Sequence, residues 1–489
     1  MLRIVDVQGY ACDGLPWVFE TSLWDRFPVG IRIIVAGTCV RGETPDVVAL
    51  AFLLRQNSAV DFCRGKRSVS CRIMESGPEE SLTELPQHDR APVEIPSYHQ
   101  SLLKYLKQEE SDLWNWFSSN RVQTDSSEAV RLELLKTAYR IGRDTAADLY
   151  ELVDVVTDRM GFKCPVTLYQ AQNFVAMNAS LAWLPNEAHV VFFGPVQEAL
   201  TNDELSALLV HELAHHELFS IQDNEFLITE QILSAMIADS AAEAPHDRTS
   251  RNYQLYTELH CDRRALQVTD NLDACVCMLV KMETGLKDVS AVSYIEQANE
   301  VLSKGPTSSD GITHPEMFIR AKALQLRHDE PDQTDAALRA FVEGPLAFRD
   351  MDLLRQRNVT DLTMTFLQRF LRHDWLQTDL VMGHAKRFFE EFRLPDADID
   401  AGTLKTSLSE CDAQLKNYFG YLLLDLVTCD ADLEEAPLAA AFLFVNEVGM
   451  AAEFTTLLTK ELKLSKRVLR KVEADAAKIV RQAEKEFVS

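Results

Sequence analysis

Apolar and polar positions change their spacing along the chain and divide it into regions. In residues 1–75, short apolar runs at 31–37 and 47–54 are separated by turn residues, a pattern typical of strands. Residues 76–98 contain Glu, Ser and four prolines, a composition that cannot build a core. The pattern predicts a small β-containing N-terminal domain over 1–75, followed by a linker over 76–98.

Helical spacing dominates the next region. Apolar residues recur at helical intervals within 127–160, and Gly161 is expected to end this helix. Extended runs at 165–169 and 189–194 predict two strands. This region therefore combines helices with a small β-sheet.

Beyond about residue 330 the chain reads as helix after helix, and the last is a charged amphipathic segment over 464–487. The expected fold class is α+β and mainly helical. It has a core domain with a small β-sheet over 99–330 and an all-helical C-terminal region over 331–489.

Composition narrows the function classes. The chain has 489 residues and a net charge of −26, which disfavours nucleic acids and anionic lipid surfaces as partners. No stretch reaches the roughly 18 apolar residues that span a bilayer, so no stable membrane insertion is expected. The start of the chain lacks the pattern of a signal peptide, and the ten cysteines are scattered. We expect a cytoplasmic protein.

Candidate chemistry lies in an apolar-periodic helix that begins at a capping box formed by Thr201 and Glu204. His211 and His215 are four residues apart, so both imidazoles project from one face and can bind one cation. This spacing suits Zn²⁺, and one zinc ion per chain is expected. Glu212 flanks that face and can accept the proton of a metal-bound water as the water attacks a peptide carbonyl.

A second predicted helix, over 253–268, offers a third ligand. Glu258 and Asp262 are four residues apart and share one face. Glu258 is predicted to bind the metal, and Asp262 to hydrogen-bond the free ring nitrogen of a ligand histidine. The alternative is a solvated helix face, since Asp and Glu are abundant in this chain.

Together, the ordered motifs resemble the HtpX-like and CAAX prenyl protease family of gluzincin metallopeptidases. The resemblance runs from about residue 148 to residue 324. It rests on Asn178-Ala179, His211-Glu212-x-x-His215, Glu258-x-x-x-Asp262, and His314-Pro315 followed by Arg320.

The resemblance implies a zincin-like fold and a zinc endopeptidase that acts on proteins or peptides. It implies a substrate extended along an edge strand that begins at Asn178 and Ala179, and the run 189–193 is the candidate for that strand or its neighbour. It also implies that His314 stabilises the oxyanion and that Arg320 braces carboxylates.

The chain departs from the family in some places. Membrane members carry transmembrane helices, but here the run 226–233 is broken by polar residues. Cys261 stands where a small residue is usual, and we interpret it as a small buried hydrophobe. His216 and His260 lie off the ligand faces and are interpreted as supporting or solvated residues.

In the C-terminal region, the run 421–435 is similar to the helical TerB-like domains, with Ala431 at a usual glycine position. Its acidic residues Asp430, Asp432, Glu434 and Glu435 are compatible with a cation site or a basic partner. We favour solvated charges at a helix N-terminus. The C-terminal helical region is the candidate surface for a protein partner.

Three functions compete. The ordered motifs favour a zinc endopeptidase. A catalytically silent, zinc-stabilised interaction or scaffold protein is the alternative, but such a protein has no need of Glu212. A deformylase or single-residue aminopeptidase is disfavoured by the arrangement of Glu258.

Overall fold

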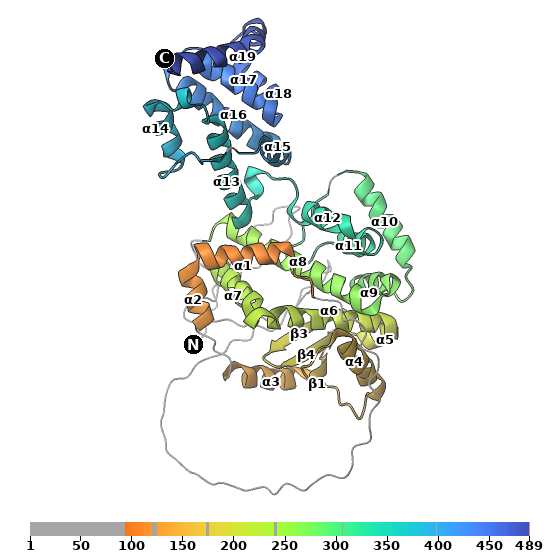
Figure 1. Ribbon diagram of the computed structural model, residues 1–489. Coiled ribbons are helices and arrows are strands. Elements are labelled where there is room, and N and C mark those ends of the chain that lie inside the picture. The colour runs from red at the N-terminus through yellow and green to blue at the C-terminus, as the bar shows by residue number, and fades with distance from the viewer. Residues whose placement is uncertain are drawn as a thin grey trace, which may run out of the picture.

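The structure is a computed structural model, and it describes residues 93–119, 125–172, 176–238, 242–305, 307–397 and 399–488 (Figure 1). The predicted domain over 1–75 and most of the predicted linker lie outside these residues. Within them, the protein is mainly helical with one small mixed sheet.

The sheet has four strands: β1 (Ala138–Arg140), β2 (Val166–Ala171), β3 (Asn178–Leu184) and β4 (Glu187–Phe193). Their order is β1-β2-β4-β3, so β3 forms one edge. β2 and β4 are parallel, whereas β1 with β2 and β3 with β4 are antiparallel. The two predicted extended runs lie in β2 and β4, which confirms them as strands.

Twelve described helices precede residue 345. They are α1 (Ser97–Glu109), α2 (Ser111–Ser119), α3 (Asp125–Thr137), α4 (Ala147–Met160), α5 (Val196–Ala199), α6 (Asn202–Ser220), α7 (Glu225–Ala238), α8 (Ala244–Thr269), α9 (Leu272–Thr284), α10 (Ala291–Ser303), α11 (Met317–Asp329) and α12 (Pro331–Glu343). α6 packs against β3, β4 and α8, and it is buried along most of its length.

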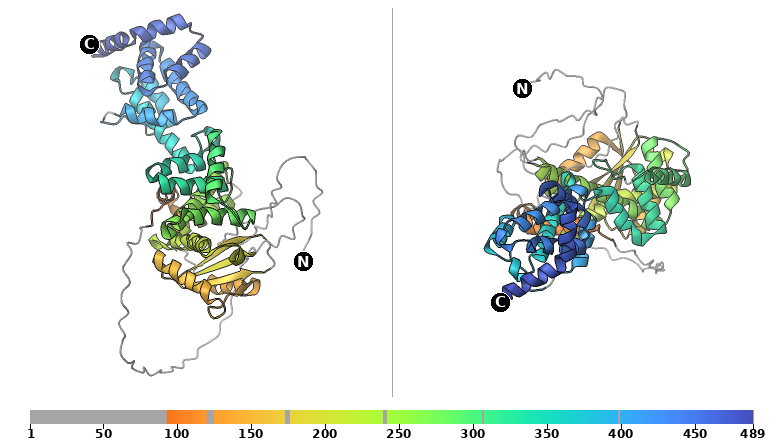
Figure 2. Two further views of the ribbon diagram at one scale, coloured as in Figure 1. Left: turned by 90° about the vertical axis from the view of Figure 1, so that its right-hand side faces the viewer. Right: turned by 90° about the horizontal axis from the view of Figure 1, so that it is seen from above.

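Seven further described helices follow. They are α13 (Leu353–Phe370), α14 (Asp379–Phe388), α15 (Ala401–Ser409), α16 (Ala413–Thr428), α17 (Ala436–Val448), α18 (Ala451–Glu461) and α19 (Lys466–Val488). They enclose one hydrophobic cluster of their own, built around residues such as Phe366, Phe419 and Phe442. Figures 1 and 2 show α16 to α19 at the end of the molecule farthest from the sheet.

Helical periodicity over 127–160 predicted helix throughout this range. That prediction is wrong for part of it, because the helix is interrupted. α3 ends at Thr137, and Ala138–Arg140 leaves the helix to pair with β2, Arg140 lying opposite Tyr169. Tertiary pairing therefore overrides the local helical pattern. The predicted end of α4 is confirmed, since Gly161 adopts a φ of 69°, which glycine accepts without strain.

A buried carboxylate joins the C-terminal helices to the core. Asp352 is fully buried at the start of α13 and accepts hydrogen bonds from the Tyr98 hydroxyl and the Asn252 amide, both at 2.8 Å. It also caps α13 by accepting from the backbone N–H of Arg355 at 2.7 Å. These contacts link α13 to α1 and α8.

Among the described helices, none combines the length and the apolar character that a bilayer-spanning segment requires.

Candidate metal centre

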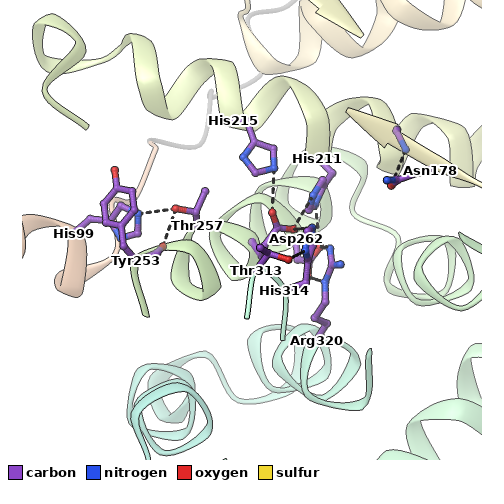
Figure 3. Close-up of polar contacts among 12 residues, drawn as sticks. His99, Asn178, His211, His215, Tyr253, Thr257, Asp262, Thr313, His314 and Arg320 are labelled. Atoms are coloured by element: carbon purple, nitrogen blue, oxygen red, sulfur yellow. Dashed lines mark hydrogen bonds and ion pairs between the residues drawn. The ribbon is translucent and has the colours of Figure 1, made fainter. Parts of the chain in front are cut away.

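Two neighbouring helices bring together the three predicted metal ligands. α6 begins at the predicted capping box: Thr201 accepts from the backbone N–H of Glu204, whose side chain accepts from the backbone N–H of Thr201. One face of α6 then presents His211 and His215 toward α8, near Asp262 (Figure 3). Glu258 of α8 is in contact with both imidazoles.

Glu258 lies between the two imidazoles. Its Oε2 is 3.3 Å from Nε2 of His211, and its Oε1 is 3.5 Å from Nε2 of His215. All three side chains are buried, and their ligating atoms lie within 4.8 Å of one another. Across the described part of the chain, this is the one group of three or more His, Cys, Asp or Glu residues with such geometry.

The donor set fits a divalent cation. Two imidazole nitrogens and one carboxylate are donors that zinc accepts in open, three-ligand protein sites. Glu258 Oε2 is buried and accepts no hydrogen bond from the described residues, so it is available to a cation. A buried carboxylate needs positive charge nearby, which a bound cation can supply in addition to the Arg320 guanidinium 3.6 Å away.

The electrostatics also favour a positive charge between the helices. Burial lowers the pKa of His211, but its contacts with Asp262 and Glu258 outweigh burial and raise that pKa to about 10. Burial raises the pKa of Glu258, yet His314 and the two α6 histidines outweigh it and hold the pKa well below its usual range. Glu258 therefore stays ionised.

A buried carboxylate and an arginine support the ligands from behind. Asp262 Oδ1 lies 3.0 Å from Nδ1 of His211, one turn beyond Glu258 on α8. Arg320 of α11 donates two hydrogen bonds to Asp262, from Nε and a terminal nitrogen, each at 2.7 Å. The same guanidinium lies 3.6 Å from Glu258 Oε2. Burial raises the pKa of Asp262, but Arg320 outweighs it, and the pKa falls to about 2.

His314 reaches the centre from the segment before α11. Its Nε2 is 3.3 Å from Oε2 of Glu258, and its Nδ1 is 2.9 Å from the Thr313 hydroxyl. The side chain is 26% exposed, whereas those of the α6 histidines are below 10%. His314 therefore stands at the solvent-facing side of the centre.

Glu212 lies next to the ligand face of α6 and is buried. Burial raises its pKa to about 7, helped by the negative charge of Glu258 and opposed by His211. A carboxyl group with a pKa near neutrality can both take up and release a proton under physiological conditions.

The predicted edge strand is an edge in the structure. Asn178 and Ala179 begin β3, which pairs on one side with β4 and packs on α6 (Figure 1). The backbone N–H of Ala179 donates to the Asn178 side chain at 2.9 Å. The run 189–193 lies in β4, so it is the neighbour of the edge strand.

His99 of α1 is a supporting residue that the sequence reasoning missed. Its side chain is fully buried, its Nε2 is 2.9 Å from the hydroxyl of Thr257, and its ring stacks on Tyr253 with centroids 4.0 Å apart (Figure 3). Thr257 directly precedes Glu258, so this contact braces the turn of α8 that carries the carboxylate. No local pattern could reveal it, because 158 residues separate the partners.

Replacing His99 with leucine is expected to lower the free energy of unfolding by about 1–3 kcal/mol, because a buried polar partner of Thr257 is lost. Denaturant unfolding followed by circular dichroism measures this. His328→Leu, at a half-exposed position on α11, is the control and should change stability little. Equal stabilities for the two variants would contradict a bracing role for His99.

Three other interpretations can be compared with the structure. Cys261 is fully buried, as expected of a small hydrophobe, and burial raises its pKa well above the usual range. A solvated position is wrong for both His216 and His260, which are buried. His216 Nε2 lies 3.1 Å from the carbonyl oxygens of Leu184 and Glu187, and thus ties α6 to the β3–β4 turn.

Comparison with known proteins gives one distant similarity. The chain is 24% identical over 230 residues to the plastoglobule-localized metallopeptidase 48, chloroplastic, of Arabidopsis thaliana. The match covers 43% of this chain and 65% of that protein. No protein-family model matches the chain, and no solved structure matches it. The similarity and the buried His-His-Glu group both indicate a distant relative of a metallopeptidase.

Proposed function

We propose that this protein is a zinc-dependent endopeptidase with a zincin-like core. The observation that carries the proposal is the convergence of His211, His215 and Glu258 beside the buried carboxyl group of Glu212. A zinc ion in such a site supplies an acidified water and polarises a carbonyl group. We propose that the chain is related to the HtpX-like and CAAX prenyl protease family.

Each residue then has a defined task. His211, His215 and Glu258 hold one zinc ion per chain. Asp262 accepts from Nδ1–H of His211 and so directs Nε2 to the metal, which binds there after displacing the Nε2 proton. Glu212 takes the proton from the attacking water and delivers it to the leaving amine. His314, on the solvent-facing side, donates to the oxyanion that develops on the peptide carbonyl.

The substrate is a protein or peptide in an extended conformation. The outer side of β3 has no neighbouring strand in the described sheet, so its backbone can pair with a peptide. Main-chain pairing requires little particular sequence, which suits an enzyme that cleaves unfolded segments. We propose a cytoplasmic setting, whereas the Arabidopsis relative is named for plastoglobules.

The test is to map the products of an unfolded protein incubated with the zinc-loaded chain. An endopeptidase releases internal fragments, whereas an aminopeptidase removes single residues from one end. Mass spectrometry distinguishes these outcomes. A chain that binds one zinc ion and yields no fragments from any unfolded protein would favour the silent scaffold instead.

Asp262→Asn is expected to weaken zinc binding about 10- to 100-fold, because the amide no longer fixes the ring of His211 or raises its basicity. Competition with a chromophoric chelator measures the affinity. Asp247→Asn is the matched control, since Asp247 is exposed on the same helix. Unchanged affinity in Asp262→Asn would show that this carboxylate does not support the metal centre.

A further inference from the structure

The last described helix carries a charge opposite to that of the whole chain. α19 contains seven Lys or Arg residues and four Asp or Glu residues, in a protein with a net charge of −26. A basic helix in an otherwise acidic protein indicates that the positive charge of this helix has a local role, such as binding an anionic partner.

The two faces of α19 are sharply different. Leu469, Ala476 and Val480 are buried and pack with the hydrophobic cluster of the C-terminal helices. At 3.6 residues per turn, six basic residues fall within a sector of about 100° on the opposite side. These residues, which we call the basic stripe, are Arg467, Arg470, Lys471, Lys478, Arg481 and Lys485.

All six side chains of the basic stripe are exposed. Within the described part of the chain none forms an ion pair, and the Nε of Arg481 donates only to the Ala477 carbonyl of its own helix. The sector contains no acidic residue: Glu473, Asp475, Glu484 and Glu486 lie to either side of it. The six cations therefore share one side of the helix, and none of them has a direct ion-pair partner there.

The stripe is straight and lies at one end of the molecule. From Arg467 to Lys485 it runs about 27 Å along the helix axis. α19 packs mainly on α17, at the end of the molecule far from the sheet and the metal centre (Figures 1 and 2). A flat surface can therefore approach the stripe from the side of α19 that faces away from the hydrophobic cluster.

We propose that the basic stripe of α19 binds an anionic lipid surface by pairing its cations with phosphate and carboxylate headgroups. Four to eight Lys or Arg residues on one face of an amphipathic helix suit such a surface. The net charge predicts repulsion, but salt screens those charges that lie more than about 10 Å from the stripe. A nucleic acid or an acidic peptide that wraps around the helix would meet the flanking carboxylates.

The test is sedimentation of the full chain with phosphatidylcholine vesicles that contain phosphatidylserine. The chain should bind these vesicles, release them as salt rises, and ignore pure phosphatidylcholine. Replacing Lys471, Lys478 and Lys485 with glutamine should weaken binding about a hundredfold, at about fivefold for each cation. Glutamine preserves helix propensity, and circular dichroism confirms that the variant is folded.

The matched control removes three exposed lysines elsewhere, Lys104, Lys163 and Lys287, so that both variants have the same net charge. It should bind as the unmodified chain does. Equal loss in the two variants, equal binding to pure phosphatidylcholine, or no binding to either vesicle would overturn the proposal. So would tighter binding to duplex DNA, RNA or polyglutamate than to the phosphatidylserine vesicles.

Discussion

Replacing Glu212 with glutamine is expected to lower the rate of peptide hydrolysis by about two to four orders of magnitude, the usual contribution of a general acid–base group. Glutamine has nearly the same shape but cannot accept the proton of the attacking water. Glu212 is not among the three converging ligands, so the variant should still bind zinc. Cleavage of an unfolded protein, measured at equal zinc content, gives the comparison.

Glu198→Gln makes the same chemical change at an exposed position just before α6 and should leave the rate unchanged. The inactive variant also serves as a trap, because it binds substrate without cutting it. Equal cleavage by Glu212→Gln and the unmodified chain would remove the proton-transfer role. If neither protein cleaves and the variant enriches no intact protein, the peptidase proposal itself fails.

The elements that the sequence predicted well are those governed by local chemistry. The capping box of Thr201 and Glu204 begins α6 as expected, and Gly161 ends α4. These features depend on hydrogen bonds and backbone angles within one turn, which a sequence displays directly. In contrast, β1 forms because β2 lies beside it and pairs with it, so the residues of β1 alone do not predict a strand.

The candidate metal centre likewise has features that the local sequence predicts and features that depend on tertiary packing. Spacing alone places His211 and His215 on one face, and Glu258 and Asp262 on another. That the two faces meet is a property of the packing of α6 on α8. His99 reaches Thr257 from α1, 158 residues earlier in the sequence, and no residue pattern predicts such a contact. The roles of these residues in catalysis remain predictions for the variants described here.

The net charge describes the whole chain and not the arrangement of its cations. A total of −26 predicts avoidance of anionic surfaces, and this stays a prediction; six cations of α19 are gathered on one exposed face. The amphipathic pattern over 464–487 predicts the helix but does not predict which elements pack against it. Which face of the helix is buried, and where the helix lies relative to the sheet, depend on the tertiary structure.

Replacing Arg320 with methionine is expected to cost about 3–5 kcal/mol of stability, because it leaves the buried carboxylate of Asp262 without its bidentate partner. Glu258, 3.6 Å from the same guanidinium, loses positive potential as well. Urea unfolding in the presence of a chelator measures the effect free of the stabilisation that a bound metal adds.

The double variant Arg320→Met, Asp262→Asn separates the ion pair from packing. Because the asparagine side chain is neutral, it should recover part of the loss, with a coupling of about 0.5–3 kcal/mol between the two positions. The control is Arg264→Met, which breaks the buried pair with Glu217 on α6. This variant should also destabilise the chain, but it should leave zinc affinity nearly unchanged. Ordinary surface substitutions and weak ion pairs change the free energy of unfolding by less than about 1 kcal/mol. If Arg320→Met lowers that free energy by no more than this, water or another group solvates Asp262.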